Sequence, residues 1–157
     1  MAKGKDNIAP RINNRRALHE YFIDAKLECG IMLVGSEVKS LRAGKAALQD
    51  AFARIINGEL FLVGAHIDPY EKAALTYNHE PRRDRKLLVH KRELKKLVGE
   101  TGERGTTLIP LAIYFKDGRA KVEIGVARGK QQHDKRASIK KREMDAEIRR
   151  AMTQRQR

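Results

Sequence analysis

Cationic side chains recur at regular spacing in the segment SEVKSLRAGK, where Lys39, Arg42 and Lys45 lie three residues apart. We expect a short helix here, because Ser36 can cap its start and Gly44 stands where a helix would stop. On such a helix the three cations would share a face that can bind a row of phosphates. The alternative for each of them is an ordinary solvated side chain.

A second segment, NNRRALHEY, combines an amide pair, two arginines, an imidazole and a phenol. Arginines bind phosphates, whereas aromatic and imidazole rings can stack on unpaired bases. The candidate RNA ligands in this segment are Asn14, Arg15, Arg16 and His19. Glu28 is a further candidate, because a carboxylate can accept hydrogen bonds from the imino and amino groups of a guanine. The alternative for Glu28 is an exposed strand residue.

The sequence does not predict an enzyme. Its five histidines are scattered without a metal-binding spacing, and its single cysteine, Cys29, lies in an apolar run that is typical of a core. The segment GETGERG would follow a helix and precede a strand, the reverse of a dinucleotide-binding loop. We therefore expect no catalytic residues, no metal and no cofactor.

The charge of the 157-residue chain is concentrated at its ends. The total is +14, of which residues 1–16 carry +4, residues 17–127 carry +3 and residues 128–157 carry +7. We expect a basic N-terminal segment over 1–16 that is disordered alone, a folded RNA-binding domain over 17–128 and a basic tail over 129–157. Basic tails on a nearly neutral body favour a nucleic-acid partner. Without a long apolar run we expect no membrane span and a cytoplasmic protein.

Hydrophobic patterning predicts a mainly β fold. Two pairs of β-rich runs flank Asn57-Gly58 and Asp117-Gly118, which are strong hairpin signals. The segment HKRELKKLVGE predicts a helix with Leu94, Leu97 and Val98 facing inward. Five or six antiparallel strands with short flanking helices and a basic C-terminal tail fit a small barrel of the oligonucleotide-binding (OB) type.

The tail has only a narrow apolar stripe, formed by Ala137, Met144, Ile148 and Ala151. Such a helix is marginal in water, and its basic side chains repel one another. We therefore expect the tail to be mostly disordered when free and helical when bound to a charged partner.

Several segments resemble the SmpB family of tmRNA-binding ribosome-rescue factors. They are NNRRALHEYFIDAKLECG, GSEVKSLRAGKA, RKLLVHKREL and KVEIGVARGKQQHDKR, and the similarity runs from about residue 7 to the end. The resemblance implies an OB-type barrel that binds the tRNA-like domain of tmRNA (SsrA RNA) and delivers it to stalled ribosomes for trans-translation. It also implies that the tail enters the decoding centre of the small subunit and the empty mRNA channel, with one protein molecule per tmRNA.

By the same resemblance, tmRNA contacts fall on Asn14, Glu28, Leu88 and His90. Ribosome contacts fall on Gly129, Lys130, Gln132, His133, Asp134, Lys135 and Arg136, and we add the tail cations Lys140, Lys141 and Arg142. The chain departs from the family pattern at His90 and Ala47, where Asn is common, and at Gln131, where Lys is common. The main rival is a structural ribosomal or ribosome-assembly protein, which would also bind RNA.

Overall fold

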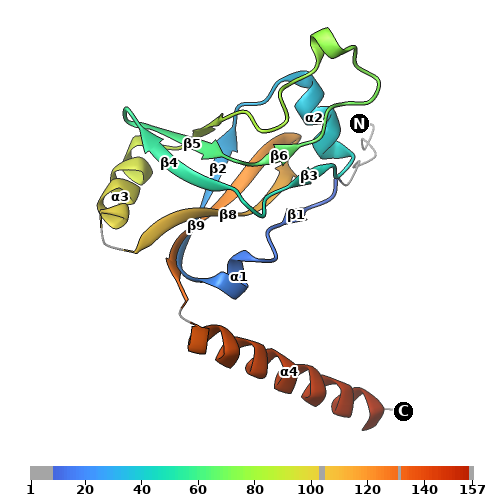
Figure 1. The fold of residues 1–157 in the computed structure, drawn as a ribbon, viewed down its shortest axis with the longest axis vertical. Helices are drawn as coiled ribbons and strands as arrows, with labels where there is room; N and C mark the ends of the chain where they lie inside the picture. Colours follow the sequence, from blue (N-terminus) through green and yellow to red (C-terminus); the bar gives the residue numbers. More distant parts are fainter. Residues whose placement is uncertain (1–8, 103–104, 131, 156–157) are drawn as a thin grey trace.

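The computed structural model of the protein describes residues 9–102, 105–130 and 132–155. Figure 1 shows a β-barrel body with α1, α2 and α3 on its surface and with α4 projecting away from it. The elements are β1 (Ile12–Asn13), α1 (Ala17–Glu20), β2 (Tyr21–Ile31), α2 (Gly35–Arg42), β3 (Ala46–Ala47), β4 (Phe52–Ile56), β5 (Glu59–Val63), β6 (His66–Ile67), a 3₁₀ turn (Leu75–Tyr77), β7 (Arg85–Leu88), α3 (Lys91–Thr101), β8 (Thr106–Lys116), β9 (Arg119–Gly129) and α4 (Gln132–Arg155).

The large sheet is antiparallel and closes on itself. Within the described residues its strand order is β1-β8-β4-β5-β7-β2-β9, and β9 also pairs with β8, which completes the ring. Strands β3 and β6 form a separate two-stranded sheet. This arrangement confirms the predicted mainly β fold, an antiparallel barrel with short flanking helices.

Both predicted hairpin turns are present. Asn57 and Gly58 have φ values of 49° and 74°, and Asp117 and Gly118 have values of 52° and 74°. Positive φ at both central residues is the geometry of the two-residue turns whose twist matches paired strands. These turns join β4 to β5 and β8 to β9, in the places that the sequence indicated.

The barrel interior is filled by aliphatic side chains from strands around the barrel. They include Leu62 of β5, Ile113 of β8 and Ile124 of β9, which are at most 1% exposed. Cys29 is fully buried among them, as the apolar run predicted. Burial raises the pKa of Cys29 to about 12, so its thiol stays protonated at neutral pH. The residue therefore belongs to the core.

Two local expectations differ from the structure. Residues 12–13 pair with β8, at Ile12↔Ile113 and Asn13↔Ala112, so part of the segment predicted to be disordered alone is packed on the barrel. Residues 1–8 lie outside the described part of the chain.

Val98 was expected to face inward, yet it is 51% exposed, because α3 packs on the barrel through Leu97.

The tail is one continuous helix, α4, which extends beyond the stripe from Ala137 to Ala151 at both ends. The side chains of Met144, Ile148 and Met152 are all more than half exposed. Among the described helices, none is both long and apolar enough to cross a membrane. Helix formation only on a bound partner stays a prediction.

Candidate nucleic-acid interface

Strands β2 and β7 bring Glu28, Leu88 and His90 together. Gly30 of β2 pairs with Leu88 of β7, which places Glu28 beside the end of β7, and His90 follows two residues later. The three residues line one hollow of about 440 Å³, together with Glu93 of α3 and Lys121 of β9. The structure therefore unites three of the predicted RNA ligands at one site.

Glu28 is held as an ionised acceptor at the edge of this hollow. The Tyr114 hydroxyl donates a hydrogen bond to Oε2, and the Lys116 ammonium lies 3.4 Å from Oε1. The hydrogen bond from Tyr114 and the charge of Lys116 lower the pKa of Glu28. Burial and the neighbouring Glu28 raise the pKa of Tyr114 to about 12, so the phenol remains a donor.

Leu88 contributes an apolar surface to the hollow. Leu88 is the last residue of β7, and its side chain is 50% exposed, whereas that of the preceding residue, Leu87, is buried. Gly30 makes room for Leu88, because a Cβ on Gly30 would lie 3.2 Å from the Leu88 Cβ. An exposed leucine beside an ionised carboxylate can pack on a base or sugar whose polar edge meets the carboxylate.

His90 lies at the start of α3. Its backbone N–H donates to Glu93 Oε2 at 3.3 Å, and its backbone oxygen accepts a bond from Leu94 at 3.0 Å. The main chain at His90 is thus fixed by the helix cap, while the imidazole is exposed at the hollow. The ring can stack on a base or form a hydrogen bond with it.

A second hollow, of about 370 Å³, continues the first. The two share Gly30, Leu88 and Lys121, and the second extends to Phe115 and to Val38 of α2. We call the combined surface the β2–β7 groove. It runs between α2 at one end and the start of α3 at the other.

The three predicted cations near α2 do not form a single face. Lys39 and Arg42 belong to the helix, but Lys45 follows its end, because Gly44 adopts a φ of 74° and terminates the helix. Lys45 lies 2.6 Å from Glu71, an ion pair that raises the pKa of Lys45. The Arg42 guanidinium lies 5.2 Å from the centre of the Phe115 ring and so borders the groove.

A buried ion network fixes α2 against the barrel. Glu37 and Arg85 are both fully buried and bonded to each other, and Arg83 adds a second guanidinium to Glu37. The remaining Arg85 donors reach the backbone oxygens of Ala65 and Pro81 at 2.9 and 3.1 Å. Burial raises the pKa of Glu37, but the bonds from Arg83, the Val34 N–H and Arg85 outweigh it, so the net pKa is lowered.

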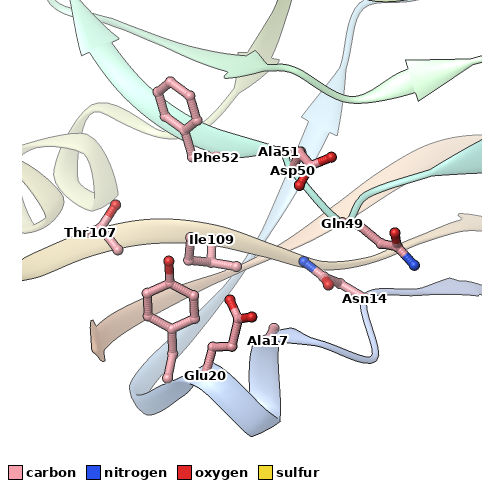
Figure 2. A pocket seen from close by; sticks show the side chains of 10 residues that line it. Asn14, Ala17, Glu20, Gln49, Asp50, Ala51, Phe52, Thr107 and Ile109 are labelled. Atoms are coloured by element: carbon pink, nitrogen blue, oxygen red, sulfur yellow. The ribbon is translucent and has the colours of Figure 1, made fainter. Parts of the chain in front are cut away.

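Asn14 lies apart from the β2–β7 groove. It is 6% exposed, and its amide nitrogen donates to the backbone oxygens of Pro110 at 2.9 Å and Leu48 at 3.3 Å. Its Oδ1 has no hydrogen-bond partner within the described residues. Figure 2 shows Asn14 at one side of a separate hollow of about 370 Å³, opposite Phe52. Asn14 thus joins the N-terminal segment to the barrel, and its assignment as an RNA ligand stays a prediction.

The other N-terminal candidates surround α1, close to the tail. Arg15 and Arg16 are exposed, His19 is partly buried, and Arg16 pairs with Glu20 at 3.7 Å. Helix α1 contacts α4, so these residues lie at the base of the tail. The structure thus divides the predicted RNA ligands between the groove and this second area.

Lys130 attaches the tail to the body. Its N–H donates to the Glu20 oxygen at 2.8 Å, and its ammonium donates to the oxygen of Leu18 and to Ser138 Oγ, at 2.9 and 2.8 Å. Gly129 ends β9, Lys135 is partly buried, and the predicted tail cations Arg136, Lys140, Lys141 and Arg142 are exposed on α4. For Gln132, His133 and Asp134 the structure describes only their place in the helix.

Comparison with known proteins decides the family. The model of the SmpB protein family matches residues 11–154. The chain belongs to the SmpB family.

Curated relatives in this family carry the name SsrA-binding protein. The one from Thermosynechococcus vestitus is 53% identical over 96% of this chain and 99% of its own length, and the one from Desulforudis audaxviator is 59% identical over 88% and 90%. A chain in a solved structure described as "tmRNA-SmpB: a journey to the center of the bacterial ribosome" is 50% identical. It matches with a TM-score of 0.68 over 83% of this chain and 95% of that chain.

Phe115 and Lys121 line the groove in this SmpB family member, and Tyr114 bonds to Glu28 at its edge; the sequence alone singled out none of these three. Tyr114 and Lys116 alternate along β8, which is a signal that both point to one side of the sheet. Their partner could not be inferred from the sequence, because Glu28 is 86 residues away from Tyr114. The two residues come together only because β9 pairs with both β2 and β8.

Proposed function

We propose that this chain binds tmRNA and delivers it to stalled ribosomes for trans-translation. The observation that carries this proposal is the β2–β7 groove, in which this member of the SmpB family unites Glu28, Leu88 and His90. Its relatives bear the name SsrA-binding protein, which identifies the RNA to test first. The protein acts by binding, with no chemical step of its own.

The groove is suited to unpaired nucleotides in the tRNA-like domain of tmRNA. Leu88 gives a base an apolar surface, and Glu28 accepts hydrogen bonds from its imino and amino groups. Arg42 at the border of the groove supplies charge for a phosphate. Apolar stacking with hydrogen bonds to the base edge is a common way to recognise single-stranded RNA.

We propose that α4 enters the decoding centre and the empty mRNA channel. Its 24 residues correspond to a rod of about 36 Å, and exposed cations lie along it. A rod of this kind fits a channel walled by RNA when no mRNA occupies it. Because tail and groove belong to one chain, binding at one site raises the effective concentration at the other. One protein molecule per tmRNA suffices for this arrangement.

The RNA partner can be identified directly. We expect the tagged protein to copurify with tmRNA and to leave ribosomal subunits in a high-salt wash. The measurement is sequencing of the bound RNA, together with sedimentation of the washed subunits. Retention on the subunits in high salt, without tmRNA, would instead indicate an integral ribosomal protein and would refute the proposal.

The role of Glu28 has a sharp electrostatic test. Glu28→Arg and Glu59→Arg both replace an exposed, lysine-paired carboxylate by a cation. Simple attraction to a polyanion predicts that either change strengthens RNA binding. We expect Glu28→Arg to weaken tmRNA binding and Glu59→Arg to preserve or strengthen it, as measured by filter binding. Equal binding by the two variants would exclude a specific contact at Glu28.

A further inference from the structure

Helix α3 carries a cationic face that none of the interactions described above uses. Lys91, Arg92, Lys95 and Lys96 are all exposed. At 100° per residue they occupy an arc of about 140°, on the side of the helix opposite the core-facing Leu94 and Leu97. The face therefore combines four positive charges on one rigid element.

These charges are not used to hold the fold together. Within residues 9–102, 105–130 and 132–155, none of the four cations forms an ion pair. The nearest acid in the sequence, Glu93, instead accepts the His90 N–H at the helix start. Like charges four residues apart, as in Lys91–Lys95 and Arg92–Lys96, destabilise a helix, so the face is a cost to the free protein.

The cationic face starts on the first turn of α3, the turn that also contributes Glu93 to the β2–β7 groove. His90 and Glu93 line the groove, and Lys91 and Arg92 lie between them in the sequence. At the other end the groove reaches Val38 of α2, and α2 carries Arg42. Figure 1 shows α2 and α3 on opposite sides of the barrel. The groove is thus bordered at both ends by a helix with exposed positive charge.

We infer that the α3 face binds backbone phosphates of the same RNA whose bases occupy the β2–β7 groove. The chemistry is a row of phosphodiesters, and continuity with the groove indicates the RNA strand that leaves it past His90. Arg92 and Lys96 are one helical turn apart, about 6 Å along the axis, so their long side chains can reach neighbouring phosphates. The inference rests on the proposed function, because it requires tmRNA in the groove.

The test uses two charge-matched double variants of the full-length protein. Arg92→Gln/Lys96→Gln removes two charges from the face, and glutamine has nearly the same helix propensity as lysine and arginine. Lys72→Gln/Arg82→Gln removes the same two types of charge from exposed positions between β6 and β7. Affinity for purified tmRNA is measured over a range of salt concentrations, and thermal unfolding verifies the fold of each variant.

We expect the α3 variant to lose about one unit of salt slope for each cation removed. The ratio of the parent's tmRNA affinity to that of the variant should then grow about sixteenfold when salt is lowered fourfold, from 200 to 50 mM. The control should retain the parent slope. A parent-like slope and affinity in the α3 variant would overturn the inference, even if the same variant bound ribosomes poorly. Failure of the unaltered protein to prefer tmRNA over another structured RNA would instead refute the proposed function.

Discussion

The charge on Glu28 depends on a neighbour that is remote in the sequence. The Tyr114 hydroxyl donates a hydrogen bond to the Glu28 carboxylate, which lowers the pKa of the carboxyl and fixes its direction at the groove. A carboxylate that reads a base must be ionised, because only then do all of its lone pairs accept hydrogen bonds. Tyr114 is therefore a positioning residue for Glu28.

Tyr114→Phe should weaken tmRNA binding and raise the pKa of Glu28. A lowered pKa keeps the carboxylate ionised to lower pH, and its loss moves protonation, with the loss of base recognition, to higher pH. We expect the acid limb of RNA binding to shift upward relative to Tyr77→Phe, which removes a hydroxyl from an 83% exposed ring. NMR titration of the Glu28 carboxyl is the direct measurement. An unshifted titration would show that Tyr114 does not tune this site.

At the residue scale, the local sequence shows which side chains can bind RNA, but it does not show whether those side chains are buried or exposed. The ability of a carboxylate to accept hydrogen bonds from a guanine made Glu28 a candidate, and the structure places it in a groove with Leu88 and His90. The segment NNRRALHEY gave no sign that Asn14 is buried, because its partners Leu48 and Pro110 are 34 and 96 residues away. Long-range hydrogen bonds of this kind leave no local pattern.

Among the elements, α2 depends on a charge pair that the core encloses. Glu37 is on α2 and Arg85 is on β7, the strand that ends at Leu88, so one ion pair positions both sides of the groove. Two buried charges are tolerated only when both remain paired. The network therefore links the geometry of the β2–β7 groove to the stability of the barrel.

Glu37→Gln should destabilise the protein by about 3–5 kcal/mol, because it leaves the buried Arg85 without its counter-charge. The parent should lose stability as pH falls through the lowered pKa of Glu37, and the variant should lack that component. Urea denaturation at neutral and acid pH measures both effects. Glu59→Gln, at an exposed pair, should change stability by at most about 1 kcal/mol. Equal losses in the two variants would contradict a structural role for the network.

Turns that depend on a few adjacent residues could be predicted from the sequence, whereas the pairing of strands distant in the sequence could not. Asn57-Gly58 and Asp117-Gly118 fix their hairpins through positive φ angles, which the sequence displays directly. The pairing of β2 with β7 joins segments more than fifty residues apart, and no neighbouring residues encode it. Similarly, Val98 is exposed because α3 packs on the barrel through Leu97, and helical periodicity alone does not show which apolar residue makes that contact.

At the scale of the whole molecule, charge and structure follow the same division. Residues 17–127 carry a net charge of only +3 and contain nearly all of the barrel, whereas residues 128–157 carry +7 and are mostly the exposed helix α4. A tail with this composition adds little to the core. Lys130 connects it to the body, because this residue bonds to the Glu20 and Leu18 oxygens of α1 and to Ser138 of α4.

Deletion of residues 131–157 should separate the two proposed binding events. Truncation after Lys130 preserves the bond from its N–H to Glu20 and all of β9, which ends at Gly129. We expect tmRNA affinity to stay close to that of the full chain, because the groove is intact, while tagging of nascent chains on stalled ribosomes is lost. The detached tail peptide, added at equal concentration, should not restore tagging, since the effective concentration supplied by the covalent link is gone. A parallel loss of tmRNA affinity and tagging would instead mean that the tail contributes to holding tmRNA itself, and the division between groove and tail would then be wrong.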